Sequence, residues 1–245
     1  MLRSLQSVVL SLLLATMPAW ATPDGDQTAG EVKRMVPDAS RNAKPLAVKD
    51  SLQWNDLLKT DAKGRVLAGL TDGSILTVGS NTELKVVQHD AKSQQTAIEM
   101  NYGKVRNQVV KITQPGGKYE VKTPNTVIGV IGTDFYVGYE NNQTTVICFE
   151  GRVLVTPTVG AAVTLSTGQM TTVDARTETT GPQVTTAPPA VMQASIIDTS
   201  VPEGQKKQAL SNRTKIIVGG VMLVVAGLTF GLTQANSSSK PCGCK

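Results

Sequence analysis

The segment Tyr119–Val155 decides the fold, and it reads YEVKTPNTVIGVIGTDFYVGYENNQTTVICFEGRVLV. Apolar and polar residues alternate along it with the two-residue period of strands that bury one face. Residues that suit turns or bulges interrupt the alternation at Thr123-Pro124, Gly132, Asn141-Asn142 and Gly151. The segment contains no strong candidate for a catalytic residue. The sequence therefore predicts a β architecture that binds or scaffolds rather than one that catalyses.

Short strand patterns of the same kind continue on both sides of this segment. Helical periodicity is nearly absent, and only Ser51–Lys59 is predicted to form a brief helix or turn. Many short strands at regular spacing predict an all-β domain, either a short-stranded flattened β-solenoid or a jelly-roll-like sandwich. The predicted strands are Arg65–Leu70, Ile75–Val78, Leu84–His89, Gln95–Met100, Val105–Ile112, Tyr119–Lys122, Val127–Ile131, Phe135–Tyr139, Thr144–Phe149, Val153–Thr156, Val163–Leu165 and Met170–Val173.

The amino-terminal residues 1–21 have the features of a secretory signal peptide. Arg3 supplies the positive charge, Val8–Leu14 is the apolar stretch, and Ala19-Trp20-Ala21 fits cleavage after Ala21. The alternative is an uncleaved anchor, although the apolar stretch is shorter than the roughly 20 residues of a membrane span. Composition then predicts three regions in order, which are a flexible leader at 22–45, the β domain at 46–173 and a Thr/Pro-rich linker at 174–215.

A second apolar run, Ile216–Leu232, predicts one carboxy-terminal membrane helix followed by a short tail at 233–245. Gly227 and Gly231 form a G-x-x-x-G pair that would allow two such helices to approach closely. The flanking basic residues do not follow the positive-inside tendency, so their distribution leaves the orientation of the helix open. The alternative is a segment that docks in the membrane or on a partner without spanning it.

Composition and cysteine content exclude several classes of function. The net charge is +5 but the basic residues are dispersed, and aromatic residues make up only 4% of the chain, so nucleic-acid binding has little support. Cys148 lies in a predicted strand, where a buried apolar role is expected. Cys242 and Cys244 form a terminal C-x-C, which supplies too few ligands for a metal site. No cofactor motif is present, and we expect none to be bound.

In its order of motifs, the chain resembles the extracytoplasmic domain of the FecR family across about 66–173. Each motif is short, and their order and spacing carry the resemblance. The matching runs are Asp72-Gly73-Ser74, Tyr102-Gly103-Lys104-Val105, Tyr119-Glu120-Val121-Lys122-Thr123-Pro124, Val130-Ile131-Gly132-Thr133-Asp134-Phe135, Glu150-Gly151-Arg152-Val153 and Leu165-Ser166-Thr167-Gly168-Gln169.

The motif residues have local physical roles that point to maintenance of the fold. Gly73, Gly103, Gly151 and Gly168 are predicted to adopt positive φ at turns. Pro124 would keep Thr123 extended at an interrupted or edge strand, and Gly132 before Thr133 would be a bulge that directs Phe135 into the core. Val105 and Val153 complete this set. The binding residues themselves are not predicted.

The resemblance implies a regulator that receives a signal from an outer-membrane receptor and controls a cytoplasmic sigma factor. Such regulators carry a cytoplasmic segment before their membrane helix, whereas this chain begins with an apparent signal peptide. The expectation is therefore a periplasmic FecR-like module, anchored to the inner membrane, that binds a protein or senses a signal. The alternative is a structural or polymer-associated envelope module without signalling. The partner is accordingly an envelope protein, such as an outer-membrane receptor or regulator, or an envelope polymer.

Catalysis is not expected. His89 is the only histidine, and its position at the end of a predicted strand suggests a solvated turn residue. A carboxylate pair for glycoside cleavage could come from Asp72, Glu99, Asp134 or Glu150, but acidic residues are ordinary at such turns and strand ends. No nucleophile elbow, phosphate-binding loop or metal-ligand spacing is present.

Overall fold

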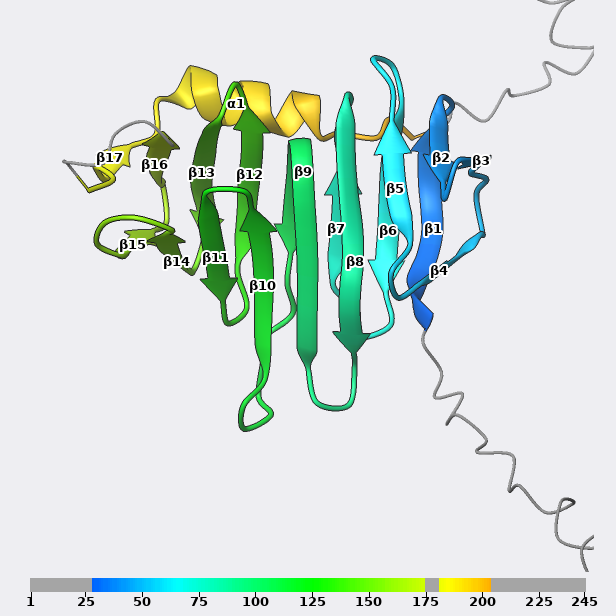
Figure 1. Ribbon diagram of the computed structural model, residues 1–245, viewed down its shortest axis with the longest axis horizontal. Coiled ribbons are helices and arrows are strands. Elements are labelled where there is room, and N and C mark those ends of the chain that lie inside the picture. Colours follow the sequence, from blue (N-terminus) through cyan, green and yellow to red (C-terminus); the bar gives the residue numbers. More distant parts are fainter. Residues whose placement is uncertain (1–27, 175–180, 204–245) are drawn as a thin grey trace, which may run out of the picture. The chain divides into compact units, whose positions relative to one another are not determined.

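The computed structural model describes residues 28–174 and 181–203, which form two β-sheets packed face to face and one helix (Figure 1). Sheet A has the strand order β4-β1-β6-β7-β9-β12-β13-β16-β17, and sheet B has the order β3-β2-β5-β8-β9-β10-β11-β14-β15. The all-β prediction is confirmed. The elements are β1 (Thr28–Val36), β2 (Ala39–Arg41), β3 (Lys44–Pro45), β4 (Ser51–Gln53), β5 (Leu57–Thr60), β6 (Arg65–Leu70), β7 (Ile75–Val78), β8 (Thr82–Asp90), β9 (Gln95–Gln108), β10 (Lys118–Thr123), β11 (Thr126–Val130), β12 (Asp134–Glu140), β13 (Gln143–Glu150), β14 (Arg152–Pro157), β15 (Val163–Ser166), β16 (Gln169–Asp174), β17 (Thr185–Thr186) and α1 (Pro189–Asp198).

From β10 onward the chain winds through the sandwich by placing successive hairpins in alternate sheets. The hairpin β10–β11 lies in sheet B, β12–β13 in sheet A, β14–β15 in sheet B and β16–β17 in sheet A. Each hairpin pairs with the strand laid down before it in the same sheet, so both sheets grow in one direction. The arrangement is a sandwich, and its regular winding is the feature that the sequence suggested as solenoid-like.

Strand β9 belongs to both sheets. Its first half pairs with β8 and, in parallel, with β10 in sheet B. Its second half, from Gly103 onward, pairs with β7 and β12 in sheet A. The sequence predicted two separate strands, Gln95–Met100 and Val105–Ile112, and the structure corrects this to one continuous strand that passes from one sheet to the other.

The core lies between the two sheets, and alternate residues of the strands fill it. In β6, for example, Val66, Ala68 and Leu70 are buried while the residues between them are only half-buried. Tyr119 from sheet B packs edge-on against Phe135 from sheet A, with ring centroids 6.3 Å apart. Because both sheets contribute to one continuous cluster of buried side chains, burial of apolar surface holds the layers together.

Three predictions about the ends of this domain are wrong. The polar stretch expected to be a leader contains β1, whose Ala29 and Val32 are buried and which pairs with β4 and β6. Ser51–Lys59 does not form one helix or turn; it contains two strands joined by a short turn at Trp54-Asn55, where Asn55 adopts positive φ and the Asp56 carboxylate accepts the Gln53 amide proton. In the expected linker, residues 181–203 contain β17 and α1.

Several further predictions lie outside the described residues. These are the signal peptide at 1–21, the apolar segment at 216–232 and the tail with Cys242 and Cys244. In the part of the chain that the structure describes, no helix is long and apolar enough to cross a membrane.

Candidate functional site

A hollow of the described surface lies on the outer face of sheet B. Cross-strand pairing places Glu120, Gly129, Leu154 and Thr164 in one row across β10, β11, β14 and β15. A Cβ atom added to Gly129 would meet no atom within 4 Å, so the missing side chain leaves a gap in this row. The resulting cleft has a volume of about 600 Å³.

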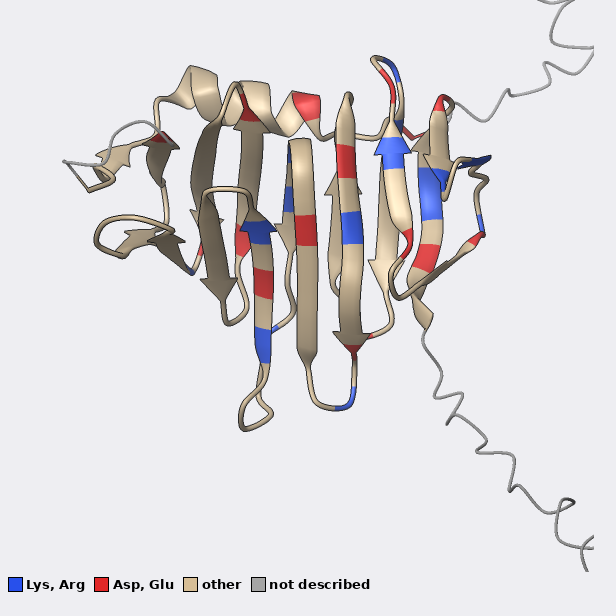
Figure 2. Ribbon diagram, viewed as in Figure 1, with Lys and Arg blue, Asp and Glu red and all other residues tan. Residues whose placement is uncertain are grey.

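Apolar side chains border this gap in unusually exposed positions. Ile131, just after β11, is 69% exposed, and Leu154 on β14 is 48% exposed. Figure 2 shows that β11 carries no charged residue, whereas the neighbouring strand β10 carries charges of both signs. Lys118 and Glu120 at the margin form an ion pair of 3.3 Å. The surface therefore combines an apolar centre with a polar border, which is the anatomy of a protein-binding site.

The β11–β12 connection is held by backbone geometry that only glycine satisfies comfortably. Gly132 has φ of +84°, and a Cβ on it would lie 2.7 Å from the Cα atom of Lys111. The next residue, Thr133, donates its hydroxyl proton to the Arg152 carbonyl at 3.0 Å, and its own carbonyl accepts the Val109 amide proton at 3.0 Å. These contacts fix the loop that presents Ile131. The exposure of the Ile131 side chain is therefore imposed by the fold.

A second hollow, of about 520 Å³, lies on the other side of the same loop. Ile131, Gly132, Thr133 and Gly151 line both hollows. Asp134 lines the second hollow, and Arg106 fixes its carboxylate by donating hydrogen bonds from two nitrogen atoms, at 2.9 and 2.6 Å. We refer to the loop 131–133 together with the two hollows as the β11–β12 surface.

Comparison with known proteins assigns this part of the chain to a family. The family model described as FecR protein matches residues 56–154, which include both strands around the β11–β12 surface. The chain contains a FecR domain. Three of the motif glycines that carry the resemblance, Gly73, Gly132 and Gly151, lie in the β11–β12 surface of this domain.

Two solved structures are similar to this chain at the level of their backbone. Both are crystal structures of a protein assigned as an anti-sigma factor from Parabacteroides distasonis, each with 17% sequence identity and a TM-score of 0.49. The alignment covers 56% of this chain in both cases and spans 63% and 62% of the length of the two structures. None of the curated proteins is similar in sequence.

The other residues of the matching motifs lie in turns or in the core. Gly73, Gly103, Gly151 and Gly168 all have positive φ, as the sequence predicts. Val105, Phe135 and Val153 are fully buried in the core. The predicted bulge at Gly132 is wrong, because Gly132 lies in the connection between β11 and β12; the register of β12 and β13 shifts instead at Asp134/Phe135, where Phe149 on β13 is the extra residue. The Ser74 amide and hydroxyl both donate to the Asp72 carboxylate, and Pro124 is exposed in the β10–β11 turn beside buried Thr123.

Asn125 organises one end of the FecR domain, and the sequence reading did not identify it. Its side-chain amide donates to the carbonyl oxygens of Asn142 and Val173, at 3.3 and 3.1 Å. Its carbonyl oxygen accepts protons from three threonine hydroxyls, those of Thr123, Thr126 and Thr144. The only available signal was its place after Pro124 in a turn, where asparagine is common for other reasons.

His89 is buried, which corrects the prediction of a solvated turn residue. It is 2% exposed, and its ring nitrogen atoms lie 2.9 Å from the hydroxyls of Thr96 and Thr71. Burial lowers the pKa of this imidazole, against an opposing effect of the nearby Asp72 and Asp90 carboxylates. Both ring nitrogens have hydrogen-bond partners and the ring has no access to solvent, so His89 in its neutral form stabilises the fold.

The described ranges 28–174 and 181–203 contain neither a candidate metal site nor a reactive thiol. No group of three or more His, Cys, Asp or Glu residues within them could hold a metal ion. Cys148 is buried, and burial raises the pKa of its thiol to about 11. A thiol with such a pKa is a poor nucleophile at neutral pH. Of the carboxylates considered for glycoside cleavage, Asp134 is paired with Arg106 and Asp72 with Ser74.

Proposed function

We propose that this chain is a membrane-tethered periplasmic module whose FecR domain binds an envelope protein and takes part in signal sensing. The observation that carries the proposal is the β11–β12 surface, where Ile131 and Leu154 are exposed around the gap at Gly129. Exposed aliphatic side chains on a rigid framework lose little conformational freedom on binding, so burying them against a partner is favourable.

The chemistry of this surface favours a protein over a charged polymer as the partner. The apolar residues Ile131 and Leu154 are at its centre, and the Lys118–Glu120 ion pair at its border leaves little net charge there. Arg152 is the remaining exposed cation of the larger hollow. A partner that inserts one apolar side chain above Gly129 and offers an acidic residue to Arg152 would complement the surface.

A non-catalytic role is part of the proposal. The only histidine of the chain is buried with both nitrogens engaged, and Asp134 is held by an arginine. Neither group is placed to exchange protons with a substrate. The tether and the compartment rest on the sequence alone, through the apparent signal peptide at 1–21 and the apolar run at 216–232.

The test is in-cell crosslinking of the full chain, followed by affinity purification and mass spectrometry of the crosslinked partners. We expect recovery of a defined envelope protein, with an outer-membrane receptor or a regulatory protein as the result that supports signal sensing. Recovery of only polymer-associated or secretion components would instead indicate a structural module and would overturn the proposal. A chain with Ile131→Asp provides the matched control, because the change lies on an exposed loop and should reduce the recovery of a true partner.

A further inference from the structure

The segment after β17 lies across the outer face of sheet A as a strap, which we define as residues 187–201. Figure 1 shows its helix α1 running across the ends of β13, β12 and β9 toward β7. The strap follows the FecR domain match, which ends at residue 154. It also contributes no residue to the main core between the two sheets.

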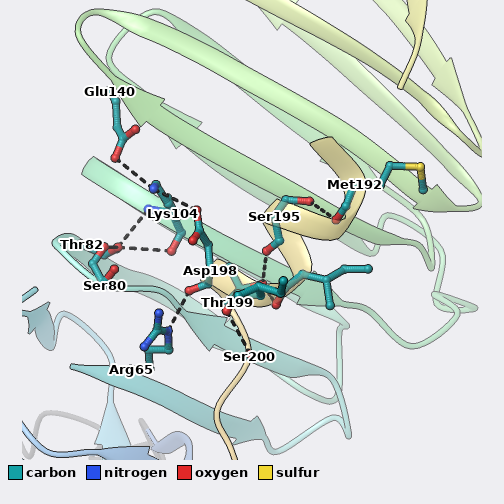
Figure 3. Close-up of polar contacts among 12 residues, drawn as sticks. Arg65, Ser80, Thr82, Lys104, Glu140, Met192, Ser195, Asp198, Thr199 and Ser200 are labelled. Atoms are coloured by element: carbon teal, nitrogen blue, oxygen red, sulfur yellow. Dashed lines mark hydrogen bonds and ion pairs between the residues drawn. The ribbon is translucent and has the colours of Figure 1, made fainter. Parts of the chain in front are cut away.

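The carboxy-terminal end of α1 is held by two cations of sheet A (Figure 3). Lys104 on β9 contacts the Asp198 carboxylate at 3.0 Å, and Arg65 on β6 donates to the Asp198 backbone carbonyl at 3.0 Å. Lys104 also lies 3.5 Å from Glu140 on β12. Cations at this end of a helix interact favourably with the helix dipole and with its unpaired carbonyl groups. The sheet thus provides a basic cradle for an acidic helix end.

A glycine of sheet A allows the backbone of the strap to approach closely. A Cβ atom on Gly79 would lie 3.1 Å from the Asp198 carbonyl oxygen and 3.1 Å from the Lys104 Cβ atom. The absence of a side chain at this position therefore completes the cradle formed by Arg65 and Lys104. The strap therefore binds at a site that the sheet itself forms.

The apolar contacts of the strap form a small cluster of their own. Tyr136 and Ile147 on the outer face of sheet A pack with Ala187, and Phe149, Met170 and Met192 join them partly buried. Figure 3 places Met192 on the turn of α1 next to Ser195. Without the strap, Tyr136 and Ile147 would be part of an exposed apolar patch beside the basic cradle, and such a patch is typical of a protein-binding surface.

The helix itself is weakly attached. Ser195 is its only buried residue, while Val191 and Ile197 are 37% and 55% exposed. No side chain caps its amino-terminal end. The helix is too short to be stable on its own, so it persists only while docked. The strap can therefore leave sheet A without opening the core of the sandwich.

We propose that the outer face of sheet A is a docking surface for a protein helix that ends in an acidic residue, and that residues 187–201 occupy it in cis as a displaceable strap. A partner helix with a carboxylate in its last turn would use the Arg65–Lys104 cradle and cover Tyr136 and Ile147. This proposal concerns sheet A and is independent of the β11–β12 surface on sheet B.

The first test measures amide hydrogen exchange of residues 189–199 in the full chain. Asp198→Lys places a third cation in the cradle, and we expect exchange in the strap to become about tenfold faster with the sandwich strands unchanged. The paired change Lys104→Asp with Asp198→Lys should restore slow exchange. Lys122→Glu, an exposed lysine on sheet B, is the control and should have no effect. Unchanged exchange in Asp198→Lys would overturn the proposal.

The second test supplies the strap as a separate peptide of residues 183–203. We expect the peptide to bind the Asp198→Lys full chain, whose own strap is released, and to bind wild-type protein at least about tenfold more weakly. A peptide carrying Asp198→Lys should bind only the full chain that carries Lys104→Asp. Failure of the wild-type peptide to bind the opened chain, or loss of this charge dependence, would contradict the assignment of a docking surface.

Discussion

At the scale of single residues, Gly103 is where strand β9 passes from sheet B to sheet A. Its φ is +103°, and an added Cβ would lie 2.3 Å from the Thr82 Oγ1 atom and 2.4 Å from the Thr82 Cα atom. The Thr82 hydroxyl also accepts the Lys104 amide proton at 2.9 Å, so the neighbouring backbone has no freedom to yield. A side chain at this position is incompatible with the crossing.

We predict that Gly103→Ala destabilises the protein by roughly 3 kcal/mol or more, because a disfavoured φ and a backbone clash act together. The matched control is Gly168→Ala, where φ is +79° but no atom lies within 4 Å of the added Cβ. That change should cost only roughly 1–2 kcal/mol, the penalty for a left-handed conformation. Urea unfolding measures both, and equal losses would show that the crossing tolerates a side chain.

The buried imidazole of His89 is the second residue with a testable consequence. Burial lowers its folded-state pKa below the ordinary value of 6.5, so near and below that pH the unfolded chain binds more protons than the folded one. The stability contributed by neutral His89 is therefore present above pH 6.5 and lost as the pH falls below it. Asp72 and Asp90, which face the ring, weaken this effect without reversing it.

We predict that His89→Gln flattens the dependence of the unfolding free energy on pH between about 6.5 and 5, where one histidine accounts for at most about 1.4 kcal/mol per pH unit. The measurement is urea unfolding at several pH values in wild type and variant. Because the variant also loses hydrogen bonds to Thr71 and Thr96, the comparison rests on the slope and not on the absolute stability. Identical slopes would mean that His89 titrates normally.

The positive φ of four motif glycines could be predicted from the sequence because this property is local. The burial of His89 and the network of Asn125 could not, since each depends on partners from other strands. Asn125 meets Val173 across 48 positions of sequence. His89 meets Thr71 across 18 positions. A polar residue next to a turn is predicted to be solvated unless its tertiary neighbours are known.

At the scale of elements, alternation of apolar residues predicted the strands well from β6 to β16. It did not predict β1, because Ala29 and Val32 are the only apolar side chains that this strand buries and the strand depends on pairing with β6. It also left α1 unpredicted, because the helix has few buried positions and forms only against sheet A. Strands and helices that form only through contacts with distant parts of the chain show only a weak pattern in their local sequence.

Strand β11 carries the element-scale prediction, because its central Gly129 shapes the larger hollow. We predict that Gly129→Val leaves stability unchanged or raises it by up to about 1 kcal/mol, since valine suits a strand and an added Cβ meets no atom within 4 Å. The same side chain would fill the gap between Glu120 and Leu154. Urea unfolding checks the first part, and a loss above about 1 kcal/mol would show that the gap is structural.

At the scale of the whole molecule, the fold places two different surfaces on the outer faces of its two sheets. The larger hollow of the β11–β12 surface lies on sheet B, and the strap lies against part of sheet A. The sequence predicted the all-β class and the FecR resemblance but no binding residue. Surfaces of this kind arise from cross-strand rows such as Glu120–Gly129–Leu154, whose members become neighbours only through strand pairing.

The mature form of the chain is the prediction that belongs to this scale. We expect the purified protein to begin at Thr22 and to fractionate with membranes, because residues 1–21 have the pattern of a cleaved signal and 216–232 that of a span. Intact mass and amino-terminal sequencing check the first expectation, and detergent extraction checks the second. A chain that retains Met1 would contradict cleavage.

The most direct test of the central claim is site-specific photo-crosslinking in cells, with the probe at Ile131 on the β11–β12 surface. Val48, 49% exposed, is the matched control. We predict a discrete protein adduct from position 131, no such adduct from position 48, and loss of the adduct when Gly129→Val fills the hollow. No discrete adduct from position 131, or the same adducts from both positions, would contradict a protein-binding role for this surface.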